Sequence, residues 1–419
     1  MYKKGYLENG TPVVTEKVAG VRSVSIGIWV KVGARFERRE KNGISHFIEH
    51  MFFKGTHNRT QEQIATEIDY LGGDLNAFTT RENTTYYVKV LKDHVNEAVD
   101  ILTDIYLNSL FKEQDIHKEQ EIISEEIKMV EDTPDDYIHD LFYTDIWGQS
   151  GLGLPVLGTQ ETVREITRND ITEHLNAHYG TADVVISCAG NIKHEAMVEL
   201  FNSKRADVTV KNTSVVESSQ GLEKKPFNAS LNVYKKDFSE VHICMGIEGV
   251  KQNSKLRYPF LILNTIYGAG VSSRLFQEVR EKRGLAYSIF SFLSSYSDTG
   301  VFGVYAATGK KKYVEVIETI IKEMDLLKNT LKEDELQRAK NQLKGNLLMS
   351  LESSSGRMQN IARQEIYYGK YYSPAQIIRG IENVKMKHVY EIIEGFIDNV
   401  PKAITVFGPA DAGKLKGVA

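Results

Sequence analysis

Cysteine is almost absent from the chain, which has 2 cysteines in 419 residues. Cys188 and Cys244 lie in VVISCAG and VHICMG, two apolar segments typical of β-strands. A small secreted protein held together by disulfides would carry many more cysteines at regular spacing. We therefore expect both thiols to be buried and reduced, and the protein to belong to the cytoplasm.

Long apolar runs and concentrated basic charge are also missing. No apolar stretch approaches the roughly 20 residues that a membrane-spanning helix needs. The first residues, MYKKGYLENGTPVV, resemble neither a signal peptide nor a transit peptide. The net charge is -4, and there is no basic run that could neutralise phosphate groups. We expect no membrane and no nucleic acid among the partners.

A faint internal repeat is the main evidence on domain organisation. FKEQDIHKEQEII, from Phe111, resembles LKEDELQRAKNQL, from Leu331, at an offset of 220 residues. VVISCAG, ending at Gly190, resembles ITVFGPA, around Gly408, at an offset of 218 residues. Similar offsets near both ends of the unit indicate a duplication, since solenoids and propellers repeat at shorter periods.

The order of the segments within each half predicts the fold class. Half-buried strands such as SVSIGIWVKV come first, and long helical segments and a closing strand follow. This order predicts an α+β fold of two homologous domains, each a mostly antiparallel sheet with helices packed on one face. We place the domains at residues 1–205 and 229–419, joined by a polar linker at residues 206–228.

The segment ISHFIEHMFFKGT carries two histidines four residues apart and reads as a helix that stops near Gly55. His46 and His50 share one helical face and could bind one ion, and Glu49 beside them could accept a proton from an activated water. The order His-x-x-Glu-His is that of the inverted zincins. The segment alone leaves a zinc centre and a helix with incidental histidines equally open, because catalytic zinc needs a third protein ligand.

Glu126 is the candidate third ligand. In EQEIISEEIKMVE a helical face at spacings of 3, 4, 7 and 11 is formed by Glu119, Ile122, Ile123, Glu126 and Val130. A carboxylate on an inward face is costly unless it is paired or binds metal. Two turns, or about 10 Å, separate the two glutamates along the helix axis. We therefore assign Glu126 as the ligand and Glu119 as its support.

A second histidine pair, His174 and His178, lies in ITEHLNAHYG at the same spacing. No acid lies between these histidines, and no helix with an inward carboxylate obviously partners them. We interpret this pair as ordinary helix polarity.

Taken together, these motifs resemble those of the pitrilysin and mitochondrial processing peptidase family of inverted zincins, nearest to its bacterial processing-protease-like members. The likeness covers nearly the whole chain. The family's third-ligand glutamate falls on Glu126, 76 positions after His50, and its supporting glutamate falls on Glu119. The resemblance implies a bacterial zinc metalloendopeptidase with one Zn²⁺ per chain, in which Glu49 activates water.

Two further segments match motifs of the family. GGDLNAFTTRENTTYY resembles an edge strand in which the backbone of Asn76, Ala77 and Phe78 pairs with an extended substrate. REKRGLAYS resembles a segment whose Arg and Tyr, here Arg280 and Tyr287, stabilise charge at the substrate carbonyl. Without the resemblance, these segments read as a turn followed by a strand and as an ordinary surface helix and turn.

The second half lacks the metal motif. TIYGAGVSSRLFQ stands where the histidine motif stands in the first half, and Asn346 aligns with Glu126. The resemblance therefore implies a zinc-bearing catalytic domain and a metal-free domain that completes a substrate chamber. It also implies that two chains surround the chamber. We expect a homodimer because this one chain carries both the metal motif and the Arg/Tyr motif.

Two acidic residues bear on substrate specificity. The resemblance places Asp136 and Asp140 where two acids of the mitochondrial enzyme face a basic substrate side chain, although solvated acids near a helix start explain them equally well. Ser150, Gly151 and Leu154 depart from a His-Pro and Arg pattern of the relatives, which affects wall contacts and not the zinc chemistry. The alternatives to an enzyme are a non-catalytic core-scaffold relative and a protein that binds peptides without cleaving them.

Overall fold

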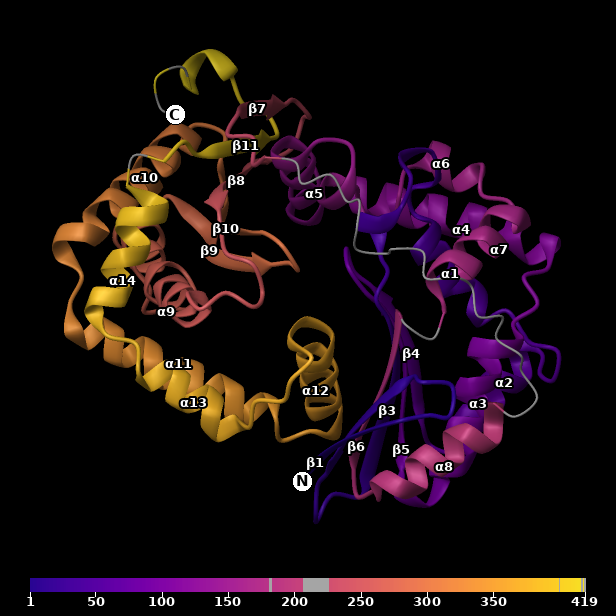
Figure 1. Cartoon of the computed structure of the whole chain (residues 1–419). Coiled ribbons are helices and arrows are strands. Elements are labelled where there is room, and N and C mark those ends of the chain that lie inside the picture. Colours follow the sequence, from indigo (N-terminus) through magenta and orange to yellow (C-terminus); the bar gives the residue numbers. More distant parts are fainter. Residues whose placement is uncertain (181–182, 206–225, 399, 416, 418–419) are drawn as a thin grey trace. The chain divides into compact units, whose positions relative to one another are not determined.

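The computed structural model describes residues 1–180, 183–205, 226–398, 400–415 and 417. These residues form two compact units, each built on one β-sheet (Figure 1). Most of the predicted linker, residues 206–225, lies outside the described residues. Among the helices that are described, none is both long and apolar enough to cross a membrane.

The first unit contains a six-stranded sheet with the order β1-β2-β6-β3-β5-β4. All neighbouring strands are antiparallel except β2 and β6, which run parallel. The strands are β1 (Tyr2–Tyr6), β2 (Pro12–Lys17), β3 (Ser23–Val30), β4 (Asp74–Thr79), β5 (Thr84–Leu91) and β6 (Val184–Gly190). Strand β4 is therefore an edge strand.

Helices of the first half cover one face of this sheet with a core of aliphatic and aromatic side chains. They are α1 (Ile44–Phe52), α2 (Gln61–Tyr70), α3 (Val95–Asn108), α4 (Glu113–Glu131), α6 (Gln160–Arg164), α7 (Arg168–His178) and α8 (His194–Arg205). The face is set by the alternation in β3, from which Val24, Ile26 and Ile28 enter this core.

The second unit repeats this topology. Its sheet has the order β7-β11-β8-β10-β9, in which only β7 and β11 are parallel. Strands β2, β6, β3, β5 and β4 of the first sheet have the same order and directions, so the predicted α+β fold with two homologous domains is confirmed. The strands are β7 (Leu231–Tyr234), β8 (Glu240–Glu248), β9 (Ala286–Ser295), β10 (Gly300–Gly309) and β11 (Ala403–Phe407).

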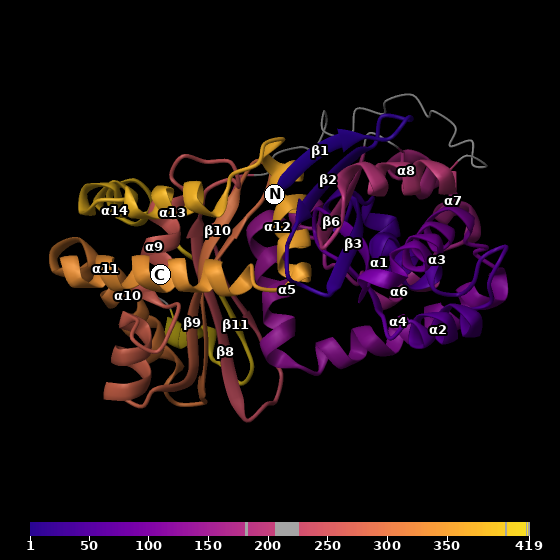
Figure 2. The ribbon, with the colours of Figure 1, turned by 90° about the horizontal axis from the view of Figure 1, so that it is seen from below.

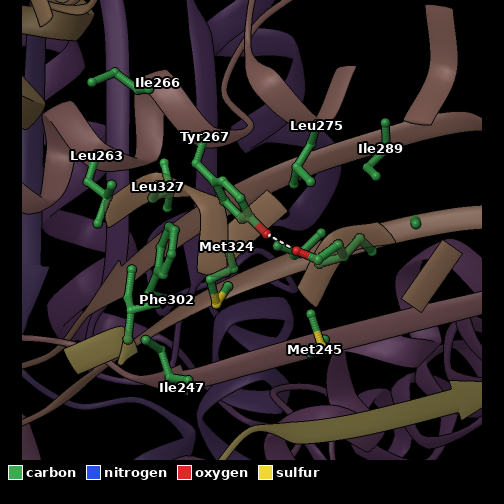
Figure 3. Packing of buried hydrophobic residues seen from close by; sticks show 14 of the residues in the cluster. Met245, Ile247, Leu263, Ile266, Tyr267, Leu275, Ile289, Phe302, Met324 and Leu327 are labelled. Carbon is green, nitrogen blue, oxygen red and sulfur yellow. Dashed lines mark hydrogen bonds between the residues drawn. The ribbon is translucent and has the colours of Figure 1, made fainter. Parts of the chain in front are cut away.

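The core of the second unit is continuous and mostly apolar (Figure 3). Tyr267 is fully buried there, and its hydroxyl donates a hydrogen bond of 2.7 Å to the carbonyl of Ile320. The helices around this core are α9 (Arg257–Tyr267), α10 (Tyr313–Thr330), α11 (Glu333–Ser350), α13 (Pro374–Glu382) and α14 (Met386–Ile392), with short π-helices at Phe276–Lys282 and Ile393–Ile397.

Each half also contributes one helix to the other unit. Helix α12 (Ser354–Tyr368) packs on β2, β3 and β6 of the first unit, and α5 (Pro134–Trp147) packs on β8 and β11 of the second (Figures 1 and 2). The two helices begin 220 residues apart, which is the offset of the repeat. The compact units therefore differ from the predicted domains, which were the continuous ranges 1–205 and 229–419. In each unit, a helix from the other half of the chain covers the second face of the sheet.

The exchange changes the interpretation of β3. Its alternation predicts a strand buried on one face only, but all residues from Val24 to Val30 are buried. Trp29 packs with Met358 and Ile361 of α12, on the face opposite Val24 and Ile26. The prediction that β3 is a half-buried strand was wrong, because the sequence of β3 does not indicate the helix that covers its second face.

Candidate metal centre

Helix α1 holds the histidine pair rigidly. It begins after Gly43, whose φ of 93° is left-handed and whose missing side chain leaves room for the carbonyl of Leu157. The carboxylate of Glu37 accepts hydrogen bonds from the backbone N–H groups of Gly43 (2.6 Å) and Ser45 (2.8 Å), which satisfies free donors at the helix start. This cap was not predicted from the sequence.

The two histidines lie together on α1, as the spacing of four predicts. Their ring centroids are 4.6 Å apart. His46 is only 8% exposed. Burial, together with the neighbouring His50, lowers the pKa of His46 to about 3. His46 is therefore neutral at ordinary pH, and this is the form that binds a metal ion.

Glu126 of α4 approaches both histidines. Its Oε2 lies 3.8 Å from Nε2 of His46 and 3.7 Å from Nε2 of His50. Ligand atoms of the three residues all lie within 4.8 Å of one another, and no other such group occurs in the described part of the chain. Ligand bonds of about 2.0–2.1 Å at tetrahedral angles put neighbouring ligand atoms about 3.3 Å apart. Two imidazoles and a carboxylate are a ligand set suited to Zn²⁺, which they would bind once their ligand atoms, now within 4.8 Å of one another, move to about 3.3 Å apart.

Glu119 and Lys54 support the second histidine. Glu119 is buried and accepts a hydrogen bond from Nδ1 of His50 at 3.1 Å, which leaves Nε2 of His50 free to face Glu126. Lys54 binds the other oxygen of Glu119 at 2.5 Å. Burial raises the pKa of Glu119, but the hydrogen bonds from His50 and Lys54 outweigh it and hold this pKa below its usual value. Lys54 was missed, although it lies four residues after His50.

Helix α4 buries Glu119 as predicted, but Glu126 is only partly buried and Ile122 was wrongly placed on the inward face. Ile122 is 50% exposed, whereas Ile116, Glu119, Ile123 and Ile127 form the buried stripe. The stripe follows the helical period from Ile116, and this carries Ile122 towards solvent. The side chain of Glu126 lies beside the stripe and is 33% exposed, so it reaches the histidines from the rim of the core.

Glu49 lies next to His50 and is half-buried. Burial raises its pKa, against the lowering effects of a hydrogen bond from Thr79 and of His50. That hydrogen bond joins Oγ1 of Thr79 to Oε2 of Glu49 at 2.5 Å. A carboxylate with a raised pKa beside a metal-ligand set is suited to accept and return a proton.

The segment with Asn76, Ala77 and Phe78 forms part of β4, at the edge of the first sheet and in contact with α1. The N–H of Ala77 donates to the side-chain oxygen of Asn76 at 2.8 Å. The ring of Phe78 packs against Trp29, with centroids 5.7 Å apart. An exposed strand edge offers backbone groups to an added strand, but the substrate role of these residues stays a prediction.

The remaining predicted residues belong to the second unit. Arg280 lies in the π-helix Phe276–Lys282, and its guanidinium carbon is 4.8 Å from the ring centroid of Tyr287, whose side chain is 78% exposed. The structure thus brings these two residues together. Asp136 and Asp140 lie one turn apart on α5. The roles of all four towards a substrate stay predictions.

Three residues to which no catalytic role was assigned differ in burial. His174 is buried in α7, and its Nε2 lies 3.3 Å from Oγ of Ser45 in α1. Leu154, in the segment that departs from the relatives, is buried as well. Asn346, which aligns with Glu126, lies on α11.

Replacing Glu126 by glutamine is expected to lower zinc affinity by more than about 100-fold, since this loss of a charged ligand exceeds the about 10–100-fold cost of losing a supporting residue. Glu125→Gln is the matched control, because the Glu125 side chain is 72% exposed and, among the described residues, pairs with Lys128 alone, at 2.6 Å. Competition with a chromophoric chelator measures both affinities. Weaker binding in the Glu125 variant and unchanged binding in the Glu126 variant would refute the assignment.

Two family models match the chain, one after the other along the sequence. The sequence model described as Insulinase (Peptidase family M16) matches residues 12–160, and the model described as Peptidase M16 inactive domain matches residues 165–343. An uncharacterized zinc protease of Bacillus subtilis is 39% identical over 393 residues, which cover 93% of this chain and 94% of the relative.

Solved structures share the fold. A protease from Helicobacter pylori has a TM-score of 0.89 at 19% identity, covering 97% of this chain and 99% of that one. A chain of complex III2 from Candida albicans has a TM-score of 0.85 at 22% identity and covers 99% of both chains. With both family models matched in order along one chain, and with a relative this similar over nearly its whole length, the chain belongs to peptidase family M16.

Proposed function

We propose that the protein is a zinc endopeptidase that hydrolyses extended peptides or unfolded segments. The observation that carries this proposal is the convergence of His46, His50 and Glu126 beside Glu49. A zinc ion bound there would polarise the peptide carbonyl and lower the pKa of water to about 7. Glu49 would accept the proton of the attacking water and pass it to the leaving amine.

An extended substrate is supported by the edge position of β4. A peptide that adds to this edge would bind through its backbone, largely independently of its side chains. Arg280 and Tyr287 would stabilise the charge that develops on the carbonyl oxygen. Asp136 and Asp140, spaced for bidentate contact with an arginine, would favour a basic residue near the cleavage site.

We further propose a homodimer with one zinc ion per chain. This rests on the presence of the metal motif and the Arg280–Tyr287 pair in the same chain. A non-catalytic scaffold is the alternative, since a chain of complex III2 from Candida albicans shares the fold. The complete set of His46, His50, Glu126 and Glu49 favours the enzyme.

The test combines metal analysis with peptide cleavage. We expect about one zinc ion per chain, cleavage of an unstructured peptide, loss of cleavage after treatment with a chelator, and recovery on adding Zn²⁺. A peptide with Arg beside the scissile bond should be cleaved fastest, one with Lys more slowly, and one with Ala most slowly. A folded, zinc-free protein without activity would reject the enzyme, and equal rates across the three peptides would reject the role of Asp136 and Asp140.

A further inference from the structure

Thr79 is the last residue of β4, directly after the residues that would pair with substrate. In the described part of the chain it is the only residue that donates a hydrogen bond to the carboxylate of Glu49. The bond occupies Oε2 of Glu49 and leaves Oε1 without a protein donor. One oxygen of the proposed base is thus anchored, and the other is available for a proton.

The hydroxyl proton of Thr79 has one strong acceptor. The other possible acceptor is Oγ1 of Thr84, but it is 3.5 Å away. Thr84 donates its own proton to the carbonyl of Val32 at 2.9 Å and so does not donate to Thr79. The contact with Glu49 is a full 1 Å shorter, at 2.5 Å, and is strengthened by the negative charge of the carboxylate. The proton of Thr79 therefore points at Glu49.

The turn after Thr79 is held firmly, so the anchor has little freedom. The N–H of Thr80 donates to the carbonyl of Asn83 at 2.8 Å, and the carbonyl of Thr80 accepts from the N–H of Ala34 at 3.3 Å. Within the turn, Glu82 forms a buried ion pair with Arg35 at 2.6 Å. These contacts fix the end of β4 to the body of the first unit.

The alternation of side chains along β4 places Thr79 on the face of the sheet that α1 covers. Phe78 packs with Trp29 on the face that α12 covers, whereas Ala77 packs against the core under α1. Thr79 follows the same alternation as Ala77 and so faces α1, which carries Glu49. Ala77 and Thr79 are about 6.6 Å apart along the strand, at about 3.3 Å per residue.

From this geometry we infer that Thr79 is a positioning residue, which sets the carboxylate of Glu49 in register with a substrate strand on β4. The inference rests on the proposed endopeptidase function. Strand β4 would bind the substrate backbone and, through Thr79, also hold the carboxylate of Glu49. One rigid strand would therefore fix the position of the base relative to the substrate. Misplacement of a reacting group by about 1 Å can cost about 100-fold in rate, so the loss of this anchor is measurable.

The test compares Thr79→Val, which has the same shape without a donor, with Thr79→Ser, which keeps the hydroxyl. In the zinc-loaded full chain we expect Thr79→Val to lower kcat by about 10- to 100-fold at a KM within about twofold of wild type. Zinc content and Tm should be unchanged, and Thr79→Ser should stay within about threefold of wild-type kcat. The matched control is Thr85→Val on β5, because the hydroxyl of Thr85 is buried and has no hydrogen-bond partner among the described residues.

Several outcomes would overturn the inference. Wild-type kcat in Thr79→Val, a loss confined to KM, an equal loss in Thr79→Ser, or an equal loss in Thr85→Val would each do so. If Thr79→Val does not fold, Thr79→Ala removes the same donor and is judged by the same criteria. Wild-type protein that binds no zinc or cleaves no peptide rejects the proposed function and the inference together, whereas wild-type cleavage that Thr79→Val retains rejects the inference alone.

Discussion

Glu49→Gln is expected to lower kcat for peptide cleavage by about 100- to 10,000-fold, the usual contribution of a general base. Glutamine has nearly the same shape as glutamate but cannot accept the proton of the attacking water. The hydroxyl of Thr79 can still donate to the side-chain oxygen of the glutamine, so the local structure should persist. Because Glu49 is not one of the three converging ligands, zinc content should stay at the wild-type level.

The measurement is single-turnover cleavage of an unstructured peptide, with zinc determined on the same samples. Glu125→Gln is the control, since it makes the same chemical change on an exposed site of α4. Activity of Glu49→Gln equal to that of wild type would exclude Glu49 as the base. Loss of zinc along with activity would show that Glu49 helps to hold the metal and would leave its role in proton transfer unsupported.

The features that were predictable from the sequence depend on local spacing. His46 and His50 could be paired because four residues bring side chains to one face of a helix. Glu119 was correctly placed on the inward face of α4, where a buried carboxylate needs a partner, and the same helical spacing brought Glu126 near the histidines although it lies beside the buried stripe. The repeat offset of 220 residues predicted two homologous domains. Five strands of the first sheet and the five strands of the second do have the same order and directions.

The features that were missed depend on contacts between distant segments. Lys54 binds Glu119, Thr79 binds Glu49, and Glu37 caps the helix that carries the histidines. The sequence around each of the three does not show which carboxylate or backbone group it meets. The exchange of α5 and α12 was missed for a similar reason. The two helices occupy equivalent places in the repeat, and an apolar stripe on a helix does not indicate which of two similar sheets it will cover.

That exchange predicts that residues 1–205, produced alone, will not fold to a stable domain. Without α12 the buried side chains of Val14, Trp29 and Val185 lose their cover, at about 1.5–3 kcal/mol for each large apolar side chain. This is a large share of the about 5–15 kcal/mol that stabilises a whole domain. Helix α5 would in turn lack its sheet and expose Phe142, which packs against Gly246.

Producing residues 1–205 and 229–419 together as separate chains should restore both units, because each chain brings the helix that the other needs. We expect the two chains to co-purify and to unfold cooperatively, as followed by circular dichroism, and each chain alone to aggregate or to show no cooperative transition. Met358→Asp together with Ile361→Asp in the second chain should abolish co-purification, since both side chains are fully buried against the first sheet. Cooperative unfolding of residues 1–205 alone would contradict this prediction, because it would mean that the first sheet is stable without α12 on its second face.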